Sequence, residues 1–221
     1  MEKLNYAHND TSAGEKKSGT QSFVKLKIDE KMQKLRESAF ERRIPVADDE
    51  TLNFLLCTVS AVKPRKILEL GTAIGVSGIA MLNRLPEARL TTVEKNADFY
   101  EEAKRNFKSF GVLSRTNAIF GDAGEVIESL DGGYDFIFLD SAKAQYVKYL
   151  PTLKHLLNKG GVLFADDVLL YGWVNGEVEV PKKRKNFVKH ILEYIEAATS
   201  DSELITSIIN IGDGVALSVK K

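Results

Sequence analysis

The chain contains a single cysteine, has no excess of either charge and has no long apolar segment. With Cys57 alone, no disulfide can form within the chain, which is typical of a reducing, intracellular setting. We expect this cysteine, inside the apolar run LNFLLCTVSAV, to be a small core residue. Lysine plus arginine equals aspartate plus glutamate, 31 each, so only local clusters can argue for a nucleic-acid partner.

No apolar stretch approaches the roughly 20 residues that a bilayer span needs. The first 21 residues also lack the apolar core of a signal peptide. We therefore expect a cytoplasmic protein without a membrane partner. Residues 1–21 are polar and aperiodic, which predicts a flexible N-terminal arm, and residues 22–221 fit one domain with a sizeable core.

Short apolar segments alternate with amphipathic ones after Pro64. The predicted strands are 66–70, 89–94, 116–122, 134–140, 160–167 and two strands around Gly212-Asp213-Gly214. The predicted helices are 23–42, 48–62 with Asp48 or Asp49 as N-cap, 76–85, 97–111, 123–130, 144–157 and 181–199. Such alternation implies right-handed crossovers and a mostly parallel sheet covered on both faces, with the last pair as an antiparallel edge. The predicted fold class is therefore α/β.

Nearly every predicted strand delivers an acidic residue to its carboxyl end, where sheets of this kind bind ligands. Each acid alone has an equally good explanation as the N-cap of the following helix. Together they would place many negative charges on one rim, which would need cations to offset them. The acids are Glu69, Glu94, Asp122, Asp140, Asp166 and Asp167.

The segment LELGTAIGVSG joins the first strand to its helix and contains Gly71 and Gly75. It is neither the dinucleotide fingerprint G-x-G-x-x-G, because Ala73 fills the second glycine position, nor a P-loop. Glu69 before the loop would repel a pyrophosphate and suits a ligand with a cationic part. Glu94 is placed to accept hydrogen bonds from two ribose hydroxyls. A nucleoside joined to a cationic amino acid describes S-adenosylmethionine, with the adenine expected near Asp122 and Ala123.

The motifs ILELGTAIGVSGIAM, VEKN, FGDA, YDFIFLDSAKAQY and GGVLFADDVLLYGWV resemble those of the cation-dependent class I O-methyltransferases, such as catechol and caffeoyl-CoA O-methyltransferases. The likeness runs from about Ile44 to the C-terminus. It implies a doubly wound Rossmann-like fold, use of S-adenosylmethionine, and a homodimer. Within the family, the stretch EVPKKRKNFVKHILEY and the tail IINIGDGVALSVKK look most like bacterial tRNA 5-hydroxyuridine methyltransferases. The cofactor-binding residues that the likeness implies are Ala47, Glu69, Gly71, Thr72, Gly75, Ser77, Glu94, Asp122, Ala123 and Asp140.

The same resemblance implies a Mg²⁺ site, or a site for another divalent cation, formed by Asp140, Asp166 and Asp167. Asp167 departs from the family, which has Asn there, but it keeps an oxygen ligand. The catalytic lysine of the family falls on Lys143, which would stabilise the developing oxyanion or take its proton. Without the resemblance, a solvated surface lysine is the favoured interpretation of Lys143.

Local charge bears on the acceptor. The basic run of Lys182, Lys183, Arg184 and Lys185 would contact tRNA phosphates, or would simply be a solvated helix start. Tyr171 and Trp173 would stack on a base or pack in the core. The favoured acceptor is 5-hydroxyuridine in a tRNA anticodon loop. The alternatives are a small catechol-like acceptor and, from another class, a non-catalytic nucleotide- or RNA-binding module.

Overall fold

The computed structural model describes residues 24–221. The predicted arm, residues 1–21, and Phe23 at the start of the first predicted helix lie outside the described residues. Helix α1 (Glu30–Glu41) begins later than predicted, because Asp29 caps it. The Asp29 carboxylate accepts the backbone N–H of Met32 at 2.8 Å, which is the usual N-cap arrangement.

In the part of the chain that the structure describes, seven strands form one sheet in the order β3-β2-β1-β4-β5-β7-β6. The first five in that order are parallel, and β7 pairs antiparallel with both β5 and β6. This arrangement confirms the predicted doubly wound α/β fold with an antiparallel edge. The strands are β1 (Lys66–Leu70), β2 (Arg89–Glu94), β3 (Thr116–Phe120), β4 (Tyr134–Leu139), β5 (Leu157–Ala165), β6 (Leu204–Ile209) and β7 (Val215–Lys220).

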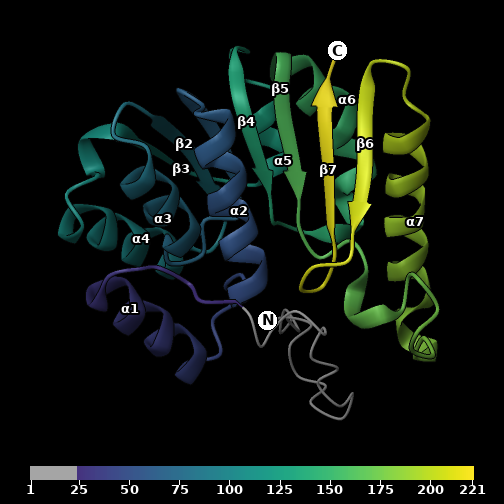
Figure 1. The fold of residues 1–221 in the computed structure, drawn as a ribbon, viewed down its shortest axis with the longest axis horizontal. Helices are drawn as coiled ribbons and strands as arrows, with labels where there is room; N and C mark the ends of the chain where they lie inside the picture. The colour runs from purple at the N-terminus through teal and green to yellow at the C-terminus, as the bar shows by residue number, and fades with distance from the viewer. Residues whose placement is uncertain (1–23) are drawn as a thin grey trace.

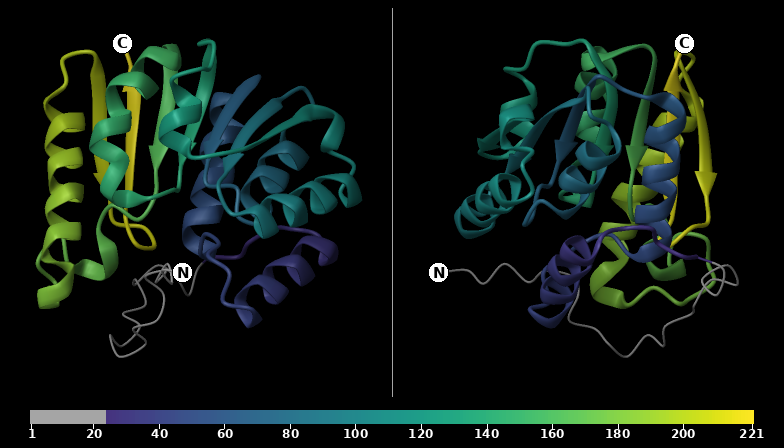
Figure 2. Two further views of the ribbon diagram at one scale, coloured as in Figure 1. Left: turned by 180° about the vertical axis from the view of Figure 1, so that it is seen from behind. Right: turned by 60° about the vertical axis from the view of Figure 1, so that its left-hand side comes forward.

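Helices cover both faces of the sheet (Figures 1 and 2). They are α2 (Asp49–Val62), α3 (Val76–Arg84), α4 (Ala97–Ser109), α5 (Ala123–Ile127), α6 (Tyr146–Leu156) and α7 (Lys185–Ser200). Alternate strand residues face opposite layers. Phe136 and Phe164 pack with α1 to α4, whereas Ile137 and Leu163 pack with α5 to α7.

Helix α2 begins at the predicted place, with Asp48 as its N-cap: the Asp48 carboxylate accepts the Thr51 N–H at 2.9 Å. The prediction for Cys57 on this helix is wrong, since Cys57 is exposed. The buried face of α2 carries Leu52, Leu55 and Val59. An apolar run identifies the helix but does not tell which residues face away from the sheet.

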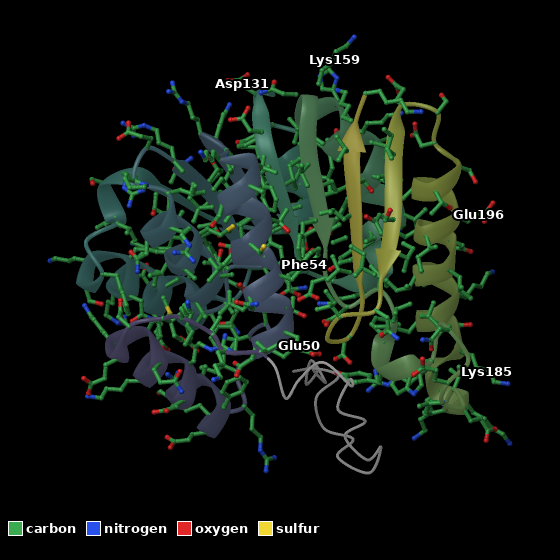
Figure 3. All side chains as sticks on the ribbon, viewed as in Figure 1. Glu50, Phe54, Asp131, Lys159, Lys185 and Glu196 are labelled. Carbon is green, nitrogen blue, oxygen red and sulfur yellow. The ribbon has the colours of Figure 1, made fainter. Side chains whose placement is uncertain are left out.

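The carboxyl ends of β4 and β5, the first turn of α2 and the β6–β7 turn meet at one end of the sheet (Figure 1). In Figure 3, Glu50 marks this end and Asp131 and Lys159 mark the opposite end. Glu50 ties two of these parts together, because its Oε2 accepts the N–H of Gly212 at 3.4 Å. Within residues 24–221, no helix is long and apolar enough to cross a membrane.

Candidate active site

A cavity of about 320 Å³ opens at the carboxyl ends of the strands. One part is lined by the glycine loop after β1, by Glu94 at the end of β2 and by Asp122 after β3. The other part is lined by Lys143, Asp167, Tyr171, Arg184 and Asp213. The cavity thus draws on strand ends and on the last hairpin, as expected for a ligand site in a doubly wound sheet.

The glycine loop approaches the rest of the site with its backbone. Gly71 has φ +103°, and a Cβ added there would overlap the carbonyl oxygen of Asp140. Glu94 holds the next part of the loop: its Oε2 accepts the N–H of Ala73 and its Oε1 accepts that of Asn96, each at 2.8 Å. Burial raises the pKa of Glu94, against the lowering effect of these backbone donors.

The structure divides the ten residues predicted to bind cofactor into two groups. Five of them line the cavity: Gly71, Glu94, Asp122, Ala123 and Asp140. The other five do not line it: Ala47, Glu69, Thr72, Gly75 and Ser77. Three of the second group lie beneath the glycine loop, where Ser77 bonds to Glu69 and Thr72 bonds to Thr92. The assignment of all ten residues to cofactor binding stays a prediction.

Glu69 requires a correction, since we expected it to contact the cationic part of a ligand. Its side chain is fully buried. It accepts hydrogen bonds from Ser77 at 2.5 Å and from Thr92 at 2.6 Å. Burial raises the pKa of Glu69 to about 7 despite these two donors. Glu69 therefore joins β1, β2 and α3 rather than facing the cavity.

Lys143 and the acids around it form the centre of the acceptor part. The Lys143 ammonium lies 2.5 Å from Asp140 Oδ1 and 2.7 Å from Asp167 Oδ2. Its side chain is only 15% exposed, so the reading as a solvated surface lysine is wrong. Burial lowers the pKa of Lys143, but attraction to Asp140 and Asp167 raises it well above its ordinary value.

The backbone around Lys143 is fixed by a buried tyrosine. Lys143 opens a short 3₁₀ helix, Lys143–Gln145, directly before α6. The Tyr146 hydroxyl is placed to donate to the carbonyl of Leu139 at 2.9 Å and to that of Asp166 at 3.3 Å. The ends of β4 and β5 and the start of α6 are thereby connected at one point.

Acidic charge exceeds basic charge around this ammonium. Asp166 is 3% exposed, and burial, followed by the charges of Asp167 and Asp140, raises its pKa well above the ordinary range. Burial and the charges of Asp167 and Asp48 raise the pKa of Asp213 to about 7. A cluster of this kind is stabilised by added positive charge.

Asp140, Asp166 and Asp167 are chemically suited to a divalent cation, because three aspartates supply only oxygen ligands. In the described part of the chain, however, no three acidic, histidine or cysteine side chains are arranged as a metal site. The ammonium of Lys143 stands between Asp140 and Asp167, and Asp166 Oδ1 accepts the N–H of Asp167 at 2.8 Å. The assignment of Asp140, Asp166 and Asp167 as metal ligands stays a prediction.

The loop after β5 is conformationally strained. Asp167, Leu170 and Tyr171 have φ values of +59°, +48° and +60°, a region that non-glycine residues seldom occupy and that is frequent at functional sites. Tyr171 lines the cavity. Trp173 does not; it is buried and packs edge-on against Tyr171, with ring centroids 5.2 Å apart.

The basic run is divided by the structure. Lys182, Lys183 and Lys185 are exposed, whereas Arg184 is half-buried and lines the cavity. Figure 3 shows Lys185 at the outer corner of the molecule, at the start of α7. Residues Lys182–Arg184 form a 3₁₀ helix and α7 begins at Lys185. One member of the run therefore faces the site, and three face solvent.

Sequence reasoning missed several lining residues, notably Asp213, Tyr149 and Phe99. We read Gly212-Asp213-Gly214 only as a hairpin turn, although its acid returns to the rim where the parallel strands end. The backbone confirms that closeness, because Leu169 and Leu170 both donate N–H groups to the carbonyl of Asp213, at 2.8 and 3.1 Å.

The fold is that of a Rossmann-like methyltransferase. A Staphylococcus aureus protein provisionally described as a caffeoyl-CoA O-methyltransferase has the same fold, with a TM-score of 0.81, 32% identity and coverage of 87% of this chain and 93% of that one. The S-adenosylmethionine complex of TomG from Streptomyces achromogenes, an O-methyltransferase involved in tomaymycin synthesis, matches with a TM-score of 0.78, 25% identity and coverage of 90% and 93%.

Residues 20–221 match the family model described as O-methyltransferase. A caffeoyl-CoA O-methyltransferase from Populus kitakamiensis is 30% identical over 203 residues, covering 85% of each chain. The chain therefore belongs to this O-methyltransferase family.

Proposed function

We propose that this protein transfers a methyl group from S-adenosylmethionine to one of two neighbouring oxygens of a planar acceptor. The observation that carries the proposal is the position of Lys143: a sequestered ammonium that lines the cavity and is held by Asp140 and Asp167. Membership of the family supports oxygen as the atom that receives the methyl group.

The glycine-loop part of the cavity suits the methyl donor, which supplies an electrophilic methyl group on a sulfonium when bound. Glu94 uses its two oxygens to hold backbone N–H groups, and a carboxylate retains further lone pairs for ribose hydroxyls. Phe99 and Tyr149 add aromatic surface to the lining of the cavity. These groups bind and orient the donor.

In the acceptor part, Lys143 would act on the oxygen that attacks the methyl carbon. A protonated lysine donates hydrogen bonds and stabilises the negative charge of an acceptor oxygen whose proton has passed to solvent. Asp140 positions the ammonium through the 2.5 Å ion pair. Holding oxygen and methyl carbon in line removes part of the barrier by orientation alone.

We propose that Asp140, Asp166 and Asp167 hold a divalent cation such as Mg²⁺. A cation there would supply Lewis-acid polarisation of the two neighbouring acceptor oxygens. The burial of Asp166 beside the charges of Asp140 and Asp167 supports this proposal.

A small catechol-like acceptor meets these requirements. The caffeoyl group named for the Populus relative carries two neighbouring ring hydroxyls. Tyr171, Phe187 and Leu170 offer the cavity an aromatic and aliphatic wall against which a planar ring can pack.

A second candidate is 5-hydroxyuridine in tRNA, which presents the same pair of oxygens through O4 and the 5-hydroxyl. The observation that favours it is the basic run: Lys182, Lys183 and Lys185 are exposed beside Arg184, which lines the cavity. Surface cations next to a base-sized cavity are what a nucleic-acid substrate needs.

The direct test is turnover with both acceptors. Purified protein, methyl-labelled S-adenosylmethionine and Mg²⁺ are incubated with a catechol or with hydroxyuridine-bearing tRNA, and label is followed by mass spectrometry. Lys143→Met should abolish transfer while binding of S-adenosylhomocysteine persists. Binding of donor or RNA without any transfer by the wild type would instead support the non-catalytic module.

We also propose that the protein forms a homodimer through the open face of β6 and β7. Among the described residues, Figure 1 shows no helix in front of these two strands. Ile205 on the edge strand is 61% exposed, and its neighbours Leu217 and Val219 are half-buried. An apolar face next to an unpaired strand edge favours pairing with a second copy.

A further inference from the structure

The ammonium of Lys143 places a positive charge among the carboxylates that are proposed to hold a cation. It lies between Asp140 Oδ1 and Asp167 Oδ2, at 2.5 and 2.7 Å. These are two of the three carboxylates that would hold a divalent cation, and the ion pairs use oxygens that such a cation needs. We propose that Lys143 is a built-in counter-ion of the cation site, which a divalent cation must displace in order to bind; this inference rests on the metal-dependent form of the proposed function.

Asp167 is the residue that gives this chain its built-in counter-ion. An amide at position 167 would be a neutral partner, whereas the carboxylate forms a second ion pair and anchors the ammonium from both sides. Asp167 also holds the third carboxylate, because its N–H donates to Asp166 Oδ1 at 2.8 Å. One residue thus fixes the lysine and the buried acid in their present positions.

The displaced ammonium would remain inside the cavity. The backbone of Lys143 is fixed by the Tyr146 hydroxyl, which bonds to the ends of β4 and β5. Lys143 also lines the cavity beside Tyr171 and Arg184. Only the flexible side chain needs to move, and the space open to it is the acceptor part. Cation binding would therefore deliver the lysine to the acceptor as it fills the site.

The experiment measures metal binding alone. Mn²⁺ is titrated into the full chain without methyl donor or acceptor, and free Mn²⁺ is read by electron paramagnetic resonance. Lys143→Met should tighten Mn²⁺ binding by roughly tenfold or more, because a positive charge between two carboxylates opposes a second cation there. Lys143→Arg keeps the charge and should bind Mn²⁺ as weakly as the wild type.

Lys154 provides a matched control. It also bridges two carboxylates, Asp201 at 2.8 Å and Glu203 at 2.5 Å, away from the cavity. Lys154→Met should leave Mn²⁺ affinity unchanged. If Lys154→Met tightens binding as much as Lys143→Met, the effect is one of total charge and the proposal is overturned.

A double-mutant cycle tests the part assigned to Asp167. In an Asp167→Asn background, Lys143→Met should tighten Mn²⁺ binding by less than about threefold, since the lysine has lost one anchor. If Lys143→Met increases Mn²⁺ affinity equally in the wild-type and Asp167→Asn backgrounds, the role assigned to Asp167 is wrong. If Lys143→Met leaves Mn²⁺ affinity unchanged or weakens it, the proposal that Lys143 is a counter-ion is wrong. A protein that binds Mn²⁺ as expected but methylates neither acceptor refutes the proposed function and leaves this inference standing.

Discussion

The carboxylate of Glu94 and the backbone N–H of Ala73 are joined by a 2.8 Å hydrogen bond across 21 positions of sequence. Glu94 therefore holds the glycine loop as well as facing the cavity. Glu94→Ala should weaken binding of S-adenosylhomocysteine by about 1–3 kcal/mol, because it removes one set of hydrogen bonds and leaves Ala73 unpaired. Glu94→Gln keeps an oxygen that can accept the Ala73 N–H, so it should weaken binding of S-adenosylhomocysteine less than Glu94→Ala does. Calorimetry measures both, and unchanged affinity in Glu94→Ala would remove this residue from the donor site.

Alanine substitutions at Gly71 and Gly111 separate two effects, the steric overlap with Asp140 and the strain of a left-handed backbone. Both have left-handed φ values, +103° and +73°, but an added Cβ overlaps Asp140 only at Gly71, and at Gly111 it meets nothing within 4 Å. Gly111→Ala should cost about 1–2 kcal/mol of unfolding free energy. Gly71→Ala should cost a further ~1–3 kcal/mol and reduce turnover, because Asp140 must shift. Urea unfolding and turnover check this, and equal losses for the two variants would contradict it.

Glu69 should make the protein less stable as pH rises. Its folded pKa is about 7 against an ordinary 4.5. Between these values the folded state binds more protons than the unfolded state, so the free energy of unfolding falls as pH increases. Glu69→Gln imitates the protonated form. Its free energy of unfolding should therefore fall less with pH than that of the wild type, by on the order of 3 kcal/mol. Urea unfolding at about pH 5 and about pH 8, with chelator present, measures the difference. Parallel declines in the two proteins would show that Glu69 does not titrate there.

The basic run should separate the two acceptors. Replacing Lys182, Lys183 and Lys185 with Gln should weaken tRNA binding at every sequence and flatten its salt dependence by roughly 0.7–0.9 per lost phosphate contact. Transfer to a free catechol should be unchanged, because these side chains lie outside the cavity lining. Arg184→Gln should affect both acceptors. No loss of tRNA binding in the triple variant would leave the catechol-like acceptor as the better candidate.

The dimer proposal predicts that one charge on the open sheet face breaks the assembly. Ile205→Glu should give a monomer in size-exclusion chromatography with light scattering, since Ile205 is 61% exposed on the edge strand. Leu192→Glu is the matched control: Leu192 is 46% exposed but lies on α7. A wild type that is monomeric, or a dimer that survives Ile205→Glu, would refute this interface.

Some elements could be predicted from the sequence to the residue. β1 and β2 match their predicted ranges, because each is a buried run between polar residues. Which residues of a helix face the core was harder to predict. Cys57 belongs to an apolar run on α2 but lies on the exposed side of that helix.

The sequence indicated which segments of the chain lie at the site, but it indicated less well where individual side chains point. Asp140, Lys143 and Asp167 were identified, and the structure brings them together. Glu69 was misplaced because the bonds to Ser77 and Thr92 that hold it beneath the loop depend on packing between elements. Asp213 was missed because a turn signal explains Gly-Asp-Gly completely at the local level, and only the sheet order shows where that turn lies.

The order β5-β7-β6 has a consequence for how the chain is made. β6 is synthesised before β7, and among the described strands β7 is its one partner, at all six of its residues. While the ribosome still holds residues 215–220, β6 lacks this partner and Asp213 has no fixed place beside the loop after β5. The acceptor part of the cavity therefore forms only after β7 is available, so a chain that lacks β7 has no complete pocket. A substitution in β7 disrupts an interior strand of the sheet, between β5 and β6, and not an edge strand.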